Sequence, residues 1–138
     1  MKQHSTNYQN TLIEIAEDSR AVSGQVPPTK VDKKSVANYQ FDLLHNHPYQ
    51  YTSDDIFFTV HAIRKEIGES EHAEEREKFF SKGQPCFRAS PLTKQYGWGI
   101  HSDQDGKVAM YGAESEEYKN LVADTSVKKV KAMRSKKK

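Results

Sequence analysis

Short apolar runs separated by polar residues recur along the whole chain, and their spacing predicts the secondary structure. Residues 11–16 (TLIEIA) are mostly apolar and contain no Gly or Pro, which predicts an opening strand. A helix is expected next, from a cap at Asp32 or Ser35 to about His45. Its apolar positions recur at helical spacing, at Val36, Tyr39, Leu43 and Leu44.

The clearest helix signals lie in residues 53–67. Thr52 or Ser53 can cap the helix, two aspartates follow in its first turn, and Gly68 stands at its far end. One apolar stripe is formed by Ile56, Val60, Ile63 and Ile67.

A second stripe of this helix, nearly opposite the first, combines Asp54, Phe58 and His61. A phenylalanine on that side suggests that both faces of the helix are covered. Asp54 and His61 would then face a partly enclosed space, about 10 Å apart along the axis at 1.5 Å per residue.

The second half of the chain reads mainly as strands. Expected strands are residues 86–89, 97–101, 107–111 and, at an edge, 127–133. Expected helices are a short acidic one ending near Phe80 and another over residues 114–123. A hairpin turn is predicted at residues 103–106, with Gly106 left-handed.

These elements together predict an α+β fold with a single domain, in which an antiparallel sheet packs against two to four helices. We expect the domain to span residues 1–134, followed by a basic tail over residues 135–138. A small protein with an exposed edge strand is also a candidate homodimer.

The composition sets limits on the class of protein. A chain of 138 residues, 35% apolar and 29% charged, fits one globular domain. No stretch approaches the roughly 20 apolar residues that span a bilayer, so we expect a cytoplasmic protein with no membrane partner. Cys86 is the only cysteine, which excludes an internal disulfide and fits a reducing compartment.

The net charge of +2 hides an uneven distribution of cations. Residues 127–138 contain seven Lys and Arg and no acid, which leaves 14 cations against 19 acids, a charge of −5, for the rest. Because the cations gather at one end instead of over a folded face, nucleic-acid binding is not favoured. It stays open only as binding of nucleic acid or an acidic partner through the tail.

The segment 79–101 mixes cations, aromatic rings and glycines, as binding loops do. We expect a small anionic ligand between this segment, extended to residue 111, and the helix 53–67. The candidate ligand-binding residues are Asp54, Asp55, His61, Lys82, Gln84, Arg88, Lys94, Tyr96, Trp98 and His101. The alternative is a tight corner in which Trp98 packs and the cations are solvated.

Catalysis is the second hypothesis. Asp54 or Asp55 beside His61 or His101 could perform acid–base chemistry. Cys86 could serve as a nucleophile, but a cysteine beside Phe87 is more often a small buried hydrophobic residue. No catalytic residue, metal ligand set or cofactor is therefore assigned, and neither a Rossmann nor a P-loop glycine motif is present.

Four strings carry a resemblance to a known family. They are YTSDDIFF (51–58), FFSKGQPCFRASPL (79–92), YGWGIH (96–101) and KAMRSKKK (131–138). With them the chain resembles a bacterial family of proteins of unknown function, so the resemblance implies no particular chemistry. Its element order is also faintly similar to that of small bacterial α+β domains of the YdhG and YjbR type.

Overall fold

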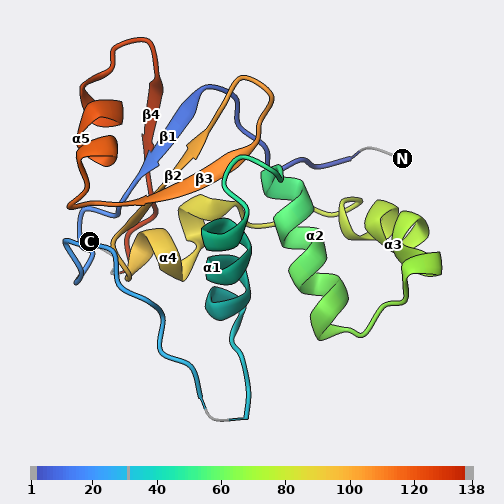
Figure 1. The fold of residues 1–138 in the computed structure, drawn as a ribbon. Helices are drawn as coiled ribbons and strands as arrows, with labels where there is room; N and C mark the ends of the chain where they lie inside the picture. Colours follow the sequence, from blue (N-terminus) through green and yellow to red (C-terminus); the bar gives the residue numbers. More distant parts are fainter. Residues whose placement is uncertain (1–2, 31, 136–138) are drawn as a thin grey trace.

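A four-stranded sheet with helices on both of its faces makes up the computed structural model, which describes residues 3–30 and 32–135 (Figure 1). The strands are β1 (Thr11–Glu14), β2 (Trp98–Ser102), β3 (Val108–Gly112) and β4 (Lys128–Lys131). The α-helices in the described ranges are α1 (Val36–Asn46), α2 (Ser53–Arg64), α3 (His72–Phe79), α4 (Pro91–Lys94) and α5 (Glu116–Ala123). Two 3-10 turns, η1 (Glu69–Glu71) and η2 (Phe87–Ala89), precede α3 and α4. The predicted α+β class is confirmed.

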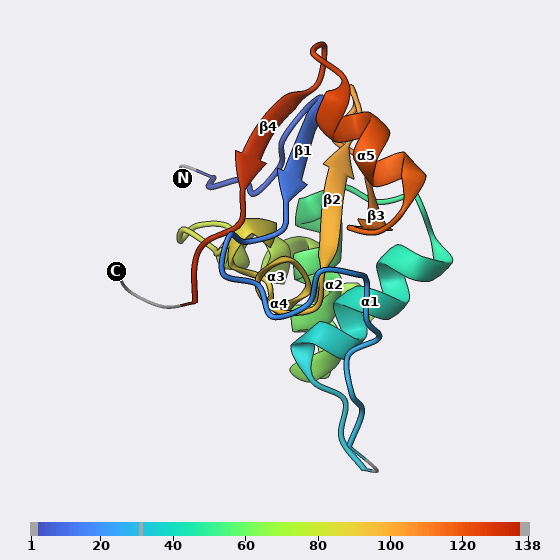
Figure 2. The ribbon, with the colours of Figure 1, turned by 90° about the vertical axis from the view of Figure 1, so that its left-hand side faces the viewer.

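The sheet has the strand order β3-β2-β1-β4. β2 pairs antiparallel with both β1 and β3, as predicted, whereas β4 runs parallel to β1, so the sheet is mixed and not purely antiparallel. The chain reaches β4 by crossing over through α5, and this crossover sets the parallel direction. In Figure 2, β4, β1 and β2 run side by side with α1, α2 and α4 beneath them.

The main core lies between the sheet and the helices beneath it. Ile13 and Ile100 of the sheet, Leu44 of α1 and Ile56 of α2 all belong to this core cluster. Trp98 packs against the same cluster, as expected for a residue on the same strand face as Ile100. The sheet's other face is covered by α5 through the buried Tyr118.

The two long helices begin where the sequence predicts. Ser35 caps α1 and Thr52 caps α2, each in a capping box with the third helical residue. α2 ends at Arg64, three residues before its predicted end, because the chain turns at Glu66, which has a left-handed φ of 54°.

Both faces of α2 are covered, as the sequence suggests. Ile56 lies in the main core, while Phe58 is buried with Phe80 and packs against Phe79 in a separate cluster. α3 and the turn after it therefore form the cover on the second face.

The strand predicted at residues 86–89 is wrong. This segment forms η2 and runs directly into α4, because Ser90 caps α4 and Pro91 occupies its first turn. The buried Thr93 hydroxyl donates to the Phe87 carbonyl at 2.6 Å, which holds the two turns together. The described residues consequently contain five α-helices, one more than the four whose positions the sequence predicts.

β4 is the predicted edge strand, and Arg88 covers part of its open side. The Arg88 Nε donates to the Lys131 carbonyl at 2.7 Å, and the Met133 N–H donates to the Arg88 carbonyl at 2.7 Å. These bonds occupy backbone groups that an unpaired edge would expose. The basic tail predicted for residues 135–138 lies, apart from Ser135, outside the described residues, and the homodimer stays a prediction.

Across the described part of the chain, no helix combines the length and the apolar character needed to cross a membrane.

Candidate functional site

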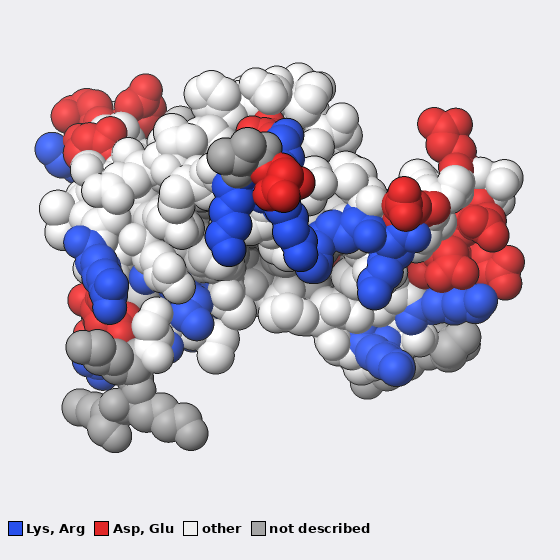
Figure 3. All heavy atoms as spheres, turned by 90° about the horizontal axis from the view of Figure 1, so that it is seen from below, with Lys and Arg blue, Asp and Glu red and all other residues white. Residues whose placement is uncertain are grey.

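A hollow of about 450 Å³ lies where the loop before α1 meets the end of α2. We call it the basic pocket; its lining residues are Pro28, Lys30, Lys33, Lys34, Ser35, Val36, Asn38, Arg64 and Tyr96. Four of them are cationic and none is acidic. On this face of the molecule, Lys and Arg side chains gather in the middle, whereas the acids gather mainly toward the two ends (Figure 3).

The loop that carries three of these lysines is tied to the first turn of α1. The Asn38 side chain accepts from the Ser35 N–H at 2.8 Å and donates to the Pro27 carbonyl at 3.1 Å and the Pro28 carbonyl at 3.3 Å. Asn38 is buried, so the helix holds the loop through a bond network screened from water. Arg64, the last residue of α2, lines the same hollow.

Only one of the four pocket cations takes part in an ion pair within the described ranges. The Lys34 ammonium lies 2.9 Å from an Asp42 carboxylate oxygen and 5.7 Å from the centre of the Tyr39 ring. The hydrogen bond to Asp42 raises the pKa of Lys34. Lys30, Lys33 and Arg64 have no carboxylate partner among the described residues.

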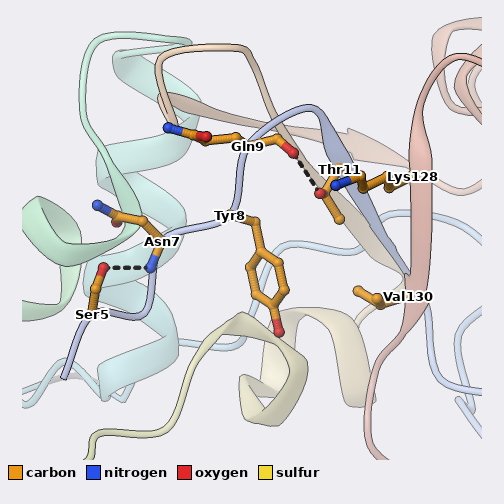
Figure 4. A pocket seen from close by; sticks show the side chains of 7 residues that line it. All are labelled: Ser5, Asn7, Tyr8, Gln9, Thr11, Lys128 and Val130. Carbon is orange, nitrogen blue, oxygen red and sulfur yellow. Dashed lines mark hydrogen bonds between the residues drawn. The ribbon is translucent and has the colours of Figure 1, made fainter.

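A second concave region follows the N-terminal segment. Two hollows of about 580 and 370 Å³ share Ser5, Asn7 and Tyr8, and we call them together the N-terminal groove. Their other lining residues are Thr6, Gln9, Thr11, Gln84, Cys86, Lys128 and Val130. Figure 4 shows the Tyr8 ring standing between the segment on one side and Lys128 and Val130 of β4 on the other.

The N-terminal segment is latched to α2 by Asp54. This carboxylate accepts from the Ser5 hydroxyl at 2.8 Å, the Thr6 N–H at 2.7 Å and the Thr6 hydroxyl at 2.7 Å. The Asp54 N–H in turn donates to the Asn7 side chain at 2.8 Å. The carboxylate of Asp54, predicted to bind a ligand, thus already accepts three intramolecular hydrogen bonds.

Cys86 lies beside Tyr8 in this groove. The Tyr8 hydroxyl is 3.7 Å from the Cys86 sulfur. Burial raises the pKa of the Tyr8 hydroxyl and the Cys86 thiol raises it further, whereas the nearby Arg88 acts in the opposite direction. The thiol is half-buried, so it has neither the full exposure of a surface cysteine nor the seclusion of a core one.

His101 forms a third polar group of residues, on the other side of the sheet. Its Nδ1 lies 2.7 Å from the Tyr49 hydroxyl, which lies 2.9 Å from the Tyr111 hydroxyl. Burial lowers the pKa of His101, partly offset by Asp103, and burial raises the pKa of Tyr49. Tyr49 itself has a left-handed φ of 60°, a strained conformation for a side chain of this size.

Asp55 and His61 of α2 are placed in structural roles. Asp55 completes the α2 capping box at Thr52 and pairs with Arg76 at 2.9 Å. Burial works against ionisation of Asp55, but the bonds from Thr52 and Arg76 outweigh it and lower the pKa. The His61 ring packs on the Phe79 ring with centroids 4.5 Å apart, and burial lowers the pKa of His61.

The predicted residues of the segment 79–101 are spread over several environments. The Trp98 indole donates to the Gln25 carbonyl at 2.8 Å and packs edge-on against Phe41. Gln84 donates to the Phe79 carbonyl at 2.8 Å, and Lys82 is exposed. Lys94 is half-buried in α4.

The structure therefore brings together only subsets of the predicted residues. Gln84 lines the N-terminal groove, and Asp54 is hydrogen-bonded to Ser5 of the same groove. Tyr96 lines the basic pocket. Four lining residues of the basic pocket were not predicted from the sequence: Lys30, Lys33, Lys34 and Arg64. The available signal was the close spacing of three lysines just before the Ser35 cap.

Among the described residues, no group of three or more His, Cys, Asp or Glu side chains is arranged to hold a metal ion.

Comparison with protein families matches residues 3–138 to the family described as "Family of unknown function (DUF6157)". Because the match covers nearly the whole chain, the protein belongs to this family. Comparisons with curated proteins and with solved structures give no match. The resemblance expected from the sequence strings is thus confirmed at the level of an uncharacterised family.

Proposed function

We propose that the protein is a binding module for a small anionic ligand and that the ligand occupies the basic pocket. The observation that carries the proposal is the cluster of four cations around one hollow, three of them without a carboxylate partner in the described ranges. The four cationic side chains are exposed and line one hollow, where like charges repel one another, so the protein alone gains little from this arrangement. An anion would relieve the repulsion and bridge the side chains.

The position agrees in part with the expectation from sequence. Arg64 belongs to the predicted helix 53–67 and Tyr96 to the predicted segment 79–111, so the pocket lies between these two parts of the chain. Most of the positive charge, however, comes from the loop before α1. Lys82, Arg88 and Lys94 remain candidates for a separate anion contact.

A triple variant tests the proposal: K30A/K33A/R64A. Binding of inorganic pyrophosphate is measured by NMR chemical-shift titration at low salt. We expect saturable shifts in the pocket residues of the native chain and a loss of affinity of about 30-fold or more in the variant, or roughly 2 kcal/mol.

A charge-matched control uses R20A/K107A/K119A, which also removes one arginine and two lysines but none that lines the pocket. The control should bind pyrophosphate within about threefold of the native chain, since its three substituted side chains do not line the pocket and cannot contact the bound anion. Equal weakening in both variants would show nonspecific attraction to net charge and would reject the pocket.

A second candidate function, acid–base catalysis, is supported by the chain of hydrogen bonds from His101 to Tyr49 and Tyr111. A histidine whose Nδ1 is held in this way can present its other ring nitrogen to a substrate. The described hollows do not include these three residues, which makes ligand binding the better-supported function. Turnover of any compound that is lost in H101Q but kept in the K30A/K33A/R64A variant would reverse this order.

A further inference from the structure

We infer that the ligand of the basic pocket is an organic diphosphate, a diphosphate group joined to a flat ring system as in a nucleoside diphosphate. The inference rests on the proposed function, because it names the ligand class for the same pocket. It follows from three features of the lining: the number of cations without a partner, the uncharged wall beside them, and the arrangement of Lys34.

The charge of the pocket sets the charge of the ligand. Lys30, Lys33 and Arg64 supply three positive charges that have no carboxylate partner among the described residues. A phosphate monoester carries about −1.5 to −2 near pH 7, so a diphosphate carries about −3. A single carboxylate would leave most of the repulsion among these cations in place. Two linked phosphates match the three charges and are long enough to bridge separate side chains.

Arg64 and the lysines suit different parts of such a ligand. The guanidinium fork of Arg64 can hold two oxygens of one phosphate at once, whereas an ammonium acts as a movable point charge. The loop lysines come from positions 30 and 33, and Arg64 comes from the far end of α2. The cations thus approach the hollow from two directions, as needed to clamp two phosphates.

The uncharged wall of the pocket is formed by Pro28, Val36 and Tyr96. Tyr96 is half-buried and packs against the main core, so its ring is held in place. A fixed aromatic ring beside phosphate-binding cations can stack on a base, a contact typically worth 1–3 kcal/mol. The hollow of about 450 Å³ falls within the usual size range of small-molecule pockets.

Lys34 can provide a further contact to the ligand if its ion pair with Asp42 is broken. Its ammonium is held by Asp42 at 2.9 Å, but the two side chains are 50% and 45% exposed. Ion pairs with this exposure contribute little to stability, so a ligand with a higher charge can displace Asp42. Asp42 then acts as an internal competitor that favours ligands of high charge.

A series of probes tests the ligand class: adenosine, inorganic pyrophosphate and ADP, all without divalent metal and measured by the same NMR titration. We expect no saturable binding of adenosine, measurable binding of pyrophosphate, and binding of ADP at least about fivefold tighter than pyrophosphate, the gain from stacking. If ADP binds no tighter than pyrophosphate, the wall makes no contact with the ligand and the inference is wrong.

Substitutions at Tyr96 and Asp42 locate the effect. Tyr96→Leu should remove the advantage of ADP over pyrophosphate, and Tyr96→Phe, which keeps the ring, should retain it. Asp42→Asn should tighten pyrophosphate binding by a few fold in the native background and have no such effect alongside Lys34→Ala. An advantage of ADP that survives Tyr96→Leu, in a variant whose NMR spectrum shows it folded, would also contradict the inference.

The outcomes separate the two proposals. If none of the probes binds, or if K30A/K33A/R64A binds pyrophosphate as well as the native chain, the proposed function itself fails. If pyrophosphate binds in the pocket but ADP gains nothing, only the ligand class fails.

Discussion

The basic pocket and the larger N-terminal groove differ in how most of their polar side chains are used. In the groove, Ser5 and Thr6 are bonded to Asp54, and Gln84 to the backbone, so these polar side chains hold the chain together. In the basic pocket, three cations have no carboxylate partner in the described ranges. From this comparison we infer that cationic side chains without a carboxylate partner, more than the volume of a hollow, indicate where an anionic ligand would bind.

The largest effect is expected from Asp54→Ala, which should destabilise the N-terminal groove and leave the basic pocket intact. The substitution removes the acceptor of three hydrogen bonds, two of them from Thr6, so we expect a loss of about 2–3 kcal/mol in the free energy of unfolding. Urea denaturation measures it. Pyrophosphate affinity should stay within about twofold, because Asp54 lies in the first turn of α2, whereas Arg64 of the pocket is the last residue of that helix.

Asp54→Asn is the matched control for this prediction. Its remaining oxygen can still accept from Thr6, whereas its amide nitrogen cannot accept from Ser5. An intermediate loss of stability is therefore expected. If the alanine variant is as stable as the native chain, the latch does not stabilise the groove.

The next largest effect is that of salt, which should weaken ligand binding in the basic pocket but leave the N-terminal groove unchanged. Raising ionic strength from about 0.05 to 0.3 M should weaken pyrophosphate binding by about tenfold, since exposed charges are screened over shorter distances. The docked N-terminal segment relies on short, direct bonds and should keep its amide hydrogen-exchange protection. Salt-independent binding would argue against a cationic pocket.

A smaller effect concerns Cys86 in the groove. Because Tyr8 lies beside the thiol and Asp54 fixes the segment, we expect iodoacetamide to react about fivefold faster in Asp54→Ala than in the native chain. Mass spectrometry of timed samples measures the rate. Tyr8→Ala should give a similar acceleration, and Asp42→Asn, at the other hollow, should give none.

The smallest predicted effect is that of pH on stability. The pKa values of His61 and His101 are lowered by burial, so the unfolded chain binds protons more readily than the folded one. Their contribution is complete above about pH 6.5, the ordinary histidine pKa, and is lost as the pH falls through the lowered values. The free energy of unfolding should thus decline from pH 7.5 to 5.5, and less steeply in H61Q/H101Q.

The basic pocket provides the comparison for that measurement. Its lining contains no His, Asp or Glu, so affinity for sulfate, which stays a dianion, should be constant from pH 6 to 8. A marked pH dependence would show that a titrating group outside the lining contributes to binding.

Local signals predicted much of the fold because caps, apolar spacing and turn residues act over a few positions. The caps at Ser35 and Thr52 and the left-handed Gly106 are of this kind. The segment 86–89 was mispredicted because its apolar residues suit a strand, while the Ser90-Pro91 signal for a helix start follows only afterwards. The parallel direction of β4 depends on a long-range crossover that no local pattern records.

The candidate site was harder to predict than the fold, since it depends on residues far apart in sequence. Tyr96, predicted to bind a ligand, lines the basic pocket, but Lys30 and Arg64 of the same lining are separated from it by 66 and 32 positions. Asp54 was selected as a carboxylate on a covered helix face. In the structure, its hydrogen-bond partners are residues of the N-terminal segment. Sequence alone does not distinguish a carboxylate that binds a ligand from one that binds its own chain.

The double hydrogen bonding of Arg88 to the β4 segment bears on how copies of this protein would associate. A neighbouring chain that extended the sheet at β4 would have to displace the Arg88 side chain from Lys131 and its carbonyl from Met133. Extension of the sheet would therefore compete with the fold of each copy. We therefore expect any dimer of this protein to form through a surface other than the β4 edge.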